Sequence, residues 1–185
     1  MKTKKIIIAL SGFHGTGKSS LARDIAEKYG LKVVSSGMVF RKIAEEMGLT
    51  LEELSRLAEE SPEIDEMIDS RLKNLAMEGG VVADALLSGW MLKDIAHIKI
   101  WLKAPKEVRI RRIADRENRD YEEVHRETIA REESEIKRFK RYYNIDLNDL
   151  SIYDFVISTH PYDYESVKNI LFSIIEGYLK VVSNE

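Results

Sequence analysis

The sequence predicts an α/β fold of three layers, in which helices cover both faces of a parallel, five-stranded sheet. Two observations predict this class. Short runs rich in isoleucine and valine alternate along the chain with longer stretches that carry helix start signals. The apolar runs are also nearly continuous, which is typical of parallel strands that are buried on both faces.

Five short segments are predicted to be the strands of this sheet. Each contains four to six residues, most of them apolar, and each is separated from the next by at least one helical stretch. In chain order they are Lys5 to Leu10, Leu31 to Ser35, Val81 to Asp84, Ile98 to Leu102 and Phe155 to Ser158.

The helices between the strands are predicted from their first residues. Thr50-Leu-Glu-Glu53 and Asp120-Tyr-Glu-Glu123 have the spacing of capping boxes, and Ser61 followed by Pro62 is an N-cap followed by a proline at the first helical position. A C-terminal helix is expected over about 164–182, because its apolar residues recur at helical spacing and would pack against the sheet.

Two connections are longer than a simple crossover between parallel strands requires. Residues 37–79 contain helices between the second and third strands, and residues 105–148 contain a long, charged helical region between the fourth and fifth. No linker or internal repeat divides the chain, so residues 1–185 are expected to form one domain. Insertions of this kind commonly carry substrate sites or lids.

Composition excludes several classes of protein. Of the 185 residues, 44% are hydrophobic, the net charge is −3 and cysteine is absent. An acidic balance disfavours a dedicated nucleic-acid binder, and the lack of cysteine excludes disulfides and thiolate metal sites. No apolar run is long enough for a membrane span. We therefore expect a soluble, cytoplasmic protein, most simply a monomer, with no nucleic-acid or membrane partner.

A phosphate-binding loop is predicted directly after the first strand. Gly12-Phe-His-Gly-Thr-Gly17-Lys18-Ser19 fits the pattern G-x-x-x-x-G-K-[ST], and a helix from Ser20 to Tyr29 follows it. In this context the backbone N–H groups and the helix N-terminus hold phosphates, which predicts a P-loop NTPase fold that binds a nucleotide. The residues expected to bind the nucleotide are Gly12, Gly15, Thr16, Gly17, Lys18, Ser19 and Ser20.

A magnesium site is expected beside this loop. The hydroxyl of Ser19 is placed to ligate Mg²⁺, and Asp84, which closes the third strand, is the acid expected to hold the ion directly or through water. Asp84 could instead cap the next turn. His14 occupies a free position of the loop and is expected to be a solvated side chain.

Arginine is concentrated in the second insertion. This concentration suits phosphoryl transfer, because planar guanidinium donors neutralise the charge on the transferred group. The alternative is that the arginines form ion pairs on a solvated helix, such as Glu127 with Arg131 or Arg131 with Glu135. A weaker signal for a second phosphate site is Ser35-Ser-Gly37 followed by Arg41. Nine of the 13 arginines lie in the second insertion: Arg109, Arg111, Arg112, Arg116, Arg119, Arg126, Arg131, Arg138 and Arg141.

At this point the residues resemble those of nucleoside monophosphate kinases, most closely the short archaeal-type cytidylate kinases. Ser35-x-Gly37 with Arg41 is similar to their acceptor site, and Arg131-Glu132-x-x-Glu135-x-x-Arg138 resembles their lid helix. Three further segments resemble the same family in the same order: the lid entry from Leu102 to Arg112, Asp84-x-x-x-x-Gly89, and the loop Ile157-Ser-Thr159 near the donor base.

The resemblance implies transfer of the γ-phosphoryl group of ATP to CMP or dCMP, with helical insertions that close over the substrates. It implies that Lys18, Arg112, Arg131 and Arg138 are catalytic and that Arg109 lies near the donor phosphates. The acceptor would be bound by Ser35, Gly37, Arg41, Asp84, Arg131 and Glu135.

One departure concerns the base. Where bacterial relatives have an arginine and a second aspartate after the position of Asp84, this chain has Ala85, Leu86 and Leu87. A kinase of AMP, UMP or another small acceptor therefore remains an alternative, as does an assembly or RNA-binding ATPase. The chain contains neither N-K-x-D nor D-x-x-G, which argues against a regulatory GTPase.

Overall fold

A parallel sheet of five strands forms the centre of the molecule in a computed structural model, which describes residues 5–183. The strand order is β2-β3-β1-β4-β5, and every neighbouring pair is parallel. The predicted α/β class and five-stranded sheet are confirmed. The strands are β1 (Ile7–Ser11), β2 (Lys32–Ser35), β3 (Val81–Asp84), β4 (Ile98–Lys103) and β5 (Phe155–Ser158).

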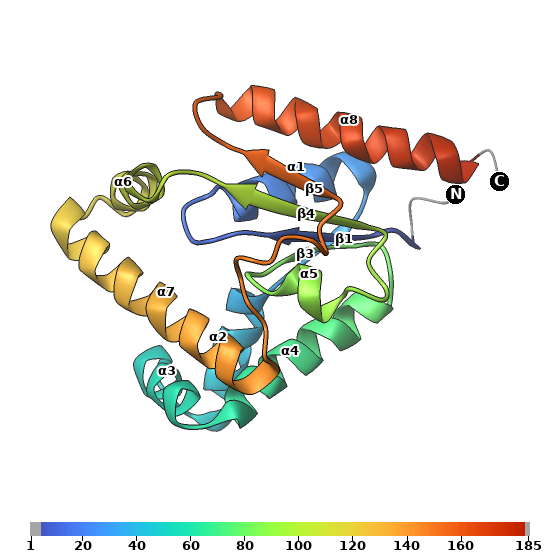
Figure 1. Cartoon of the computed structure of the whole chain (residues 1–185). Coiled ribbons are helices and arrows are strands. Elements are labelled where there is room, and N and C mark those ends of the chain that lie inside the picture. Colours follow the sequence, from blue (N-terminus) through green and yellow to red (C-terminus); the bar gives the residue numbers. More distant parts are fainter. Residues whose placement is uncertain (1–4, 184–185) are drawn as a thin grey trace.

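Helices fill the connections between the strands (Figure 1). The capping box at Thr50 is complete, whereas Asp120 accepts from the backbone N–H of Glu123 without the reciprocal bond, because Glu123 binds Arg119 instead. The helices are α1 (Lys18–Tyr29), α2 (Ser36–Met47), α3 (Leu51–Glu60), α4 (Pro62–Met77), α5 (Ser88–Met91), α6 (Lys106–Glu117), α7 (Tyr121–Tyr143) and α8 (Tyr164–Ser183).

Helices α1 and α8 cover one face of the sheet. Leu21 and Ile25 of α1 and Leu171 of α8 are fully buried against alternate residues of β1 and β4, such as Ile8 and Ile100. Alternation places these strand residues on one face, and removing so much apolar surface from water is the main stabilising contribution here. The C-terminal helix therefore packs as its apolar spacing predicts.

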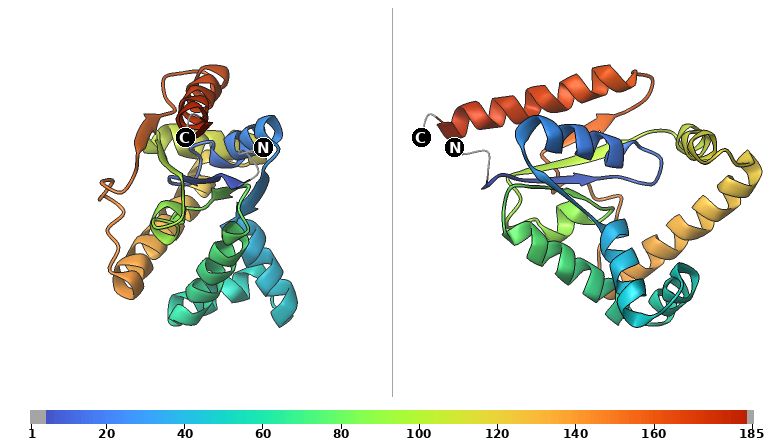
Figure 2. Two further views of the ribbon diagram at one scale, coloured as in Figure 1. Left: turned by 90° about the vertical axis from the view of Figure 1, so that its right-hand side faces the viewer. Right: turned by 180° about the vertical axis from the view of Figure 1, so that it is seen from behind.

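The opposite face is covered by α4, α5 and the end of α7, which completes three layers (Figure 2). Leu72 and Ala76 of α4 pack on Ile7, Val81 and Ala83 of the sheet, and the cluster extends to Leu92 after α5. Trp101 and Phe139 belong to a separate apolar cluster below β4. These aromatic rings are core residues, as expected from their position beside apolar elements.

The two long connections meet on one side of the sheet. Helices α2, α3 and α4 form the insertion between β2 and β3 and pack through their own apolar cluster, which includes Ile43, Leu54 and Ile64. The long helix α7 descends from α6 toward this insertion (Figure 1), and its Ser134 donates to Glu59 of α3 at 3.1 Å. The sheet edge that carries the phosphate loop thus lies between two helical segments.

Within residues 5–183, no helix combines the length and the apolar character that crossing a bilayer would require.

Candidate functional site

The phosphate loop links β1 to α1 and is held against its neighbours by close backbone contacts. Gly12 and Gly15 both have positive φ, of 142° and 77°. A Cβ atom on Gly12 would lie 2.3 Å from the carbonyl oxygen of Leu102, and one on Gly15 would lie 2.3 Å from that of Arg109. Only glycine fits this backbone and these contacts, so the loop is shaped by β4 and α6 as well as by its own sequence.

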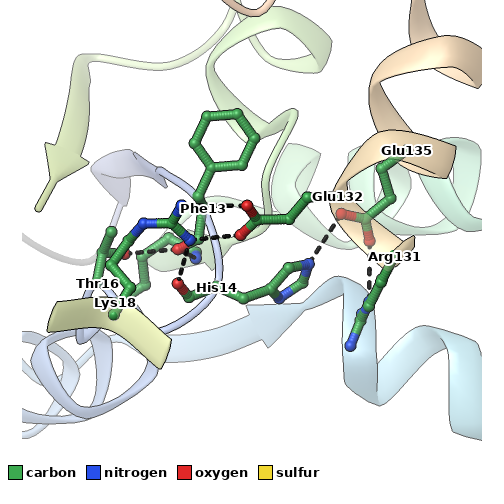
Figure 3. A network of polar contacts seen from close by, with 8 residues as sticks. Phe13, His14, Thr16, Lys18, Arg131, Glu132 and Glu135 are labelled. Atoms are coloured by element: carbon green, nitrogen blue, oxygen red, sulfur yellow. Dashed lines mark hydrogen bonds and ion pairs between the residues drawn. The ribbon is translucent and has the colours of Figure 1, made fainter. Parts of the chain in front are cut away.

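Two side chains of the loop converge on one carbonyl oxygen (Figure 3). Thr16 donates its hydroxyl hydrogen to the carbonyl of Phe13 at 2.8 Å, and the Nζ of Lys18 donates to the same oxygen at 2.9 Å. Burial lowers the pKa of Lys18, while the nearby carboxylates of Asp84 and Glu135 oppose that effect. A partly desolvated ammonium group that is held inside a glycine-rich loop is suited to contact phosphate oxygens.

A cavity of about 230 Å³ lies between the phosphate loop and the second insertion. On the loop side it is lined by His14, Gly15, Gly17, Lys18, Ser19 and Ser20, which are residues expected at a nucleotide site apart from His14. On the other side it is lined by Arg116, Arg119, Thr128 and Arg131 from α6, α7 and their connection. Glu117 and Glu127 line the same side and pair with Arg119, so the loop faces arginines together with carboxylates across this space.

Arg109 of α6 forms a buried ion pair with Glu132 of α7 and also bonds the phosphate loop. Arg109 is 5% exposed and donates through both terminal nitrogens to the carboxylate of Glu132, with 3.1 Å between Nη2 and Oε2. Its Nη1 also donates to the carbonyl of His14 at 2.8 Å. The Arg109 side chain therefore braces the loop backbone, and its expected contact with donor phosphates stays a prediction.

His14 is a second link between the loop and α7, and the expectation that it is a solvated side chain is wrong. Its Nε2 lies 2.8 Å from Oε2 of Glu135, whose Oε1 accepts from Nε of Arg131 at 3.1 Å (Figure 3). Burial opposes ionisation of Glu135, but attraction to His14 and Arg131 and the hydrogen bonds from both outweigh it and lower the pKa to about 2. A charged network thus joins the loop to the helix expected to be the lid.

The expected acceptor residues from the first insertion begin at the same sheet edge. Ser35 caps α2 by accepting from the backbone N–H of Met38 at 3.1 Å, and it pairs in register with Asp84 across β2 and β3. Arg41 is exposed in the second turn of α2. Its guanidinium lies close to Gly37, since Nη1 would be 3.6 Å from a Cβ atom at that residue. The structure therefore brings Ser35, Asp84 and the start of the phosphate loop together.

The Mg²⁺ site expected at Ser19 and Asp84 stays a prediction. Ser19 follows Lys18 at the start of α1, and Asp84 is 6% exposed and pairs in register with Leu10, two residues before Gly12. Mg²⁺ is usually held by one or two protein oxygens together with substrate phosphates and waters, rather than by a cage of side chains. Among residues 5–183, no cluster of three or more histidine, aspartate or glutamate side chains forms such a cage.

Two of the arginines expected to be catalytic lie outside this cavity. Arg112 donates to the hydroxyl oxygen of Thr159 at 2.9 Å and to its carbonyl at 2.7 Å, which places it at the loop after β5. Arg138 lies farther along α7, with its Nε 3.4 Å from Oδ2 of Asp65 on α4. Their catalytic roles stay predictions.

Several residues of the cavity and of the network around His14 and Arg109 were not predicted from the sequence to be functional. Glu127 pairs with Arg119 at 2.6 Å and not with Arg131, whereas the expected pair of Arg131 with Glu135 is present. The arginine count signalled that Arg116 and Arg119 belonged to a basic region without showing that they face the loop. Glu132 stood inside the lid pattern with no assigned role, and nothing local marked Asp65 as buried.

Comparison with known proteins agrees with this geometry. A family model described as "Cytidylate kinase-like family" matches residues 7–161. The chain is 48% identical to the cytidylate kinase of Methanocaldococcus jannaschii and 46% identical to that of Staphylothermus marinus. Each alignment covers 95% of this chain, and they cover 100% and 99% of the two relatives.

A solved structure shows the same fold at much lower identity. The shikimate kinase of Bacteroides thetaiotaomicron superposes with a TM-score of 0.61 at 16% identity, over 92% of this chain and 98% of that one. At this identity the likeness concerns the fold alone. With a family model that matches most of its length and curated relatives that align from end to end, this chain belongs to the cytidylate kinase-like family.

Proposed function

We propose that this protein transfers the γ-phosphoryl group of ATP to the phosphate of CMP or dCMP, giving ADP and CDP or dCDP. The observation that carries the proposal is the cavity in which Arg131 of α7 faces Lys18 of the phosphate loop. Beside it, α2 with Arg41 begins at the sheet edge where Asp84 ends β3. The names of the curated relatives supply the substrate class.

The chemistry requires positioning and charge neutralisation more than proton transfer. An oxygen of the acceptor phosphate attacks the γ-phosphorus of ATP, the bond from that phosphorus to the β–γ bridging oxygen breaks, and the electron pair leaves with ADP. The acceptor is already anionic, so no general base is needed. Lys18 and Arg131 stabilise the negative charge on the transferring group, and Arg41 holds the acceptor phosphate.

The residues Ser19 and Asp84 would hold Mg²⁺ at the junction of the loop and β3. When bound, the ion supplies positive charge to the β- and γ-phosphate oxygens. The chain's own contribution is to exclude water. His14 bonds Glu135 of α7, and Arg109 of α6 bonds both Glu132 of α7 and the His14 carbonyl of the loop, so the second insertion is held against the loop. Closure of this kind suppresses hydrolysis of ATP and strengthens each charge interaction inside.

The test is ADP formation from ATP and Mg²⁺ with CMP, dCMP, UMP, AMP and GMP supplied separately, beside a reaction without acceptor. Rapid turnover with CMP and dCMP is the expected result. Turnover with another monophosphate would keep the reaction type and change the substrate. Hydrolysis that is indifferent to every acceptor would overturn the proposal and favour an ATPase that acts on a different partner.

A further inference from the structure

Arg119, which lines the phosphate-loop cavity, is held by three carboxylates. Its two terminal nitrogens donate to the two carboxylate oxygens of Glu127 at 2.8 and 2.6 Å, in the two-bond geometry that the arginine fork favours. Nη2 also donates to Glu123 at 2.7 Å, and Nη1 lies 3.5 Å from Oε2 of Glu117. One positive charge therefore lies among three negative ones.

Local backbone geometry brings these groups together. Helix α6 ends at Asn118, which has a left-handed conformation with a φ of 51°, and Asp120 then caps α7. Arg119 lies between the two helix ends. Glu123 and Glu127 follow in α7 at a spacing of four residues, so their side chains lie on the same face of the helix and both reach the guanidinium.

Two of the three carboxylates belong to the wall of the cavity. Glu117 and Glu127 line it together with Arg119, across from Lys18 and Ser19 of the phosphate loop. Hydrogen bonds from Arg119 lower the pKa of Glu127, so this carboxyl group is negatively charged at neutral pH. A polyphosphate that enters the cavity thus meets carboxylates where the proposed function places its donor phosphates, and like charges in a partly enclosed space repel one another.

Carboxylate and phosphate are alternative partners of an arginine. Both accept two parallel N–H bonds from the guanidinium fork, and phosphate carries the greater negative charge. The side chain of Arg119 is 33% exposed and that of Glu127 is 57% exposed, so a released carboxylate returns to water at small cost. This ion pair is therefore weak enough to be exchanged for a phosphate.

Two other arginines near the loop are less free to change partners. Arg109 is buried, and its nitrogens already bond a carboxylate of α7 and the carbonyl of His14. Its release would leave a charge without a partner inside the protein, which is costly. Arg131 is exposed, but its partner Glu135 is buried and also bonds the His14 side chain. Of these three arginines, Arg119 combines a place on the cavity wall with partners that can leave.

We propose that Arg119 exchanges the carboxylate of Glu127 for a phosphate group of the donor nucleotide, so that Glu127 acts as a built-in competitor that limits nucleotide affinity. This exchange rests on the proposed function, whose donor site it regulates. In the free protein Glu127 occupies the arginine fork. In the complex the fork binds phosphate, and the side chain of Glu127 turns toward solvent. Neutralising Glu127 therefore tightens nucleotide binding, a gain that damage to the fold cannot produce.

The test is the Kd of the β,γ-imido analogue of ATP, with Mg²⁺ and without acceptor, measured by isothermal titration calorimetry for E127Q, R119Q and the double variant. We expect E127Q to lower the Kd about threefold, because a partly exposed ion pair no longer competes with phosphate. R119Q should raise the Kd about tenfold or more, because a charge-assisted bond to phosphate is lost. The double variant should bind like R119Q, since Glu127 has no arginine to occupy. E122Q neutralises an exposed acid of α7 outside the cavity wall and should bind like the wild type.

Each contrary outcome has its own meaning. An unchanged Kd in E127Q would overturn the competition. An equal gain from E127Q with and without Arg119 would show plain repulsion between carboxylate and phosphate, and would overturn the exchange. An R119Q variant that binds as tightly as the wild type would remove Arg119 from the donor site. A wild type that does not bind the analogue would overturn the donor site of the proposed function itself, whereas a wrong acceptor would leave these results unchanged, since the assay contains none.

Discussion

Nε2 of His14 in the phosphate loop lies 2.8 Å from Oε2 of Glu135 in the middle of α7. The same carboxylate accepts from Arg131, and its side chain is 11% exposed. A charge-assisted bond that is partly shielded from water contributes more than a surface ion pair. The phosphate loop and the helix that carries Arg131 are therefore connected directly, in addition to Arg109, which bonds both the His14 carbonyl and Glu132.

Removing this connection should impair turnover with both substrates. His14→Ala leaves Glu135 with Arg131 as its remaining bonded partner, and hydrogen bonds to charged groups contribute about 1.5–3 kcal/mol. We expect kcat/KM for ATP and for CMP to fall by about tenfold or more, as measured by coupled ADP release. His14→Gln, which can still reach Glu135 with an amide N–H, should recover part of the loss.

The matched control for this change is His125→Ala, which removes a histidine from the first turns of α7, where its ring contacts that of Tyr121 at a tilt. Its kinetic constants should stay within twofold of the wild type. Unchanged kcat/KM in His14→Ala would show that the enzyme does not use the link between the loop and α7 in its catalytic cycle.

The contrast between His14 and its neighbours shows what could be predicted from sequence. The glycines, Lys18 and Ser19 act through local backbone geometry, which a spacing of eight residues specifies. The central strands β1, β3 and β4 were also predictable from local sequence, because burial on both faces leaves a local apolar run. His14 acts through a carboxylate 121 residues away, and no pattern around it indicates that contact.

The basic composition of the second insertion could be read from the sequence, but the contacts of its individual arginines could not. The number of arginines indicated a basic region. In the structure they have separate contacts: Arg109 bonds the loop backbone, Arg112 bonds Thr159 and Arg138 forms an ion pair with Asp65. Asp65 and Asp69 lie in a helix rich in charged residues and look like part of a solvated face. Their burial depends on how α7 crosses α4, which is a tertiary relationship.

Lys18→Ala should abolish most of the turnover. The ammonium group sits within the loop beside the Phe13 carbonyl and faces the cavity, so its loss removes charge stabilisation from the transferring phosphoryl group. We expect kcat to fall on the order of 10²-fold or more. Lys28→Ala, on the same helix but paired with Glu176 on the surface, should remain active. Near-normal turnover in Lys18→Ala would contradict the assignment of this loop.

Arg41→Ala should affect the acceptor alone. Arg41 stands on α2, outside the cavity that is lined by the phosphate loop, so the lost attraction concerns the monophosphate. The expected result is a KM for CMP raised about tenfold or more with an almost unchanged KM for ATP, measured by varying each substrate in turn. Lys42→Ala, an exposed neighbour, is the charge-matched control. Equal losses for both nucleotides would remove Arg41 from the acceptor site.

Breaking the buried pair of Arg109 and Glu132 should destabilise the fold. Glu132→Ala leaves a guanidinium that is 5% exposed without its counterion, and such uncompensated charges cost about 3–5 kcal/mol. The Tm in a calorimetric scan should fall by roughly 10 °C. Glu123→Ala removes a partner of the more exposed Arg119 and should cost under about 1 kcal/mol. A similar Tm for both variants would contradict a structural role for the buried pair.

Asp69→Asn should stabilise the protein at alkaline pH. Burial raises the pKa of Asp69 in the folded state to about 7, above its ordinary value of 3.8. Between these values the folded state binds more protons than the unfolded chain, so the free energy of unfolding decreases as pH rises through this window and stays lower above it. An asparagine carries no such charge, and we expect it to add on the order of 2 kcal/mol at pH 8 and much less at pH 4.

Urea unfolding of the wild type and the variant at both pH values measures this difference. The control is Asp149→Asn, because hydrogen bonds from Ser151 lower the pKa of that exposed carboxyl and its neutralisation should bring no gain at pH 8. Parallel pH profiles for the wild type and Asp69→Asn would show that the Asp69 carboxyl is ionised in the folded state over the whole range.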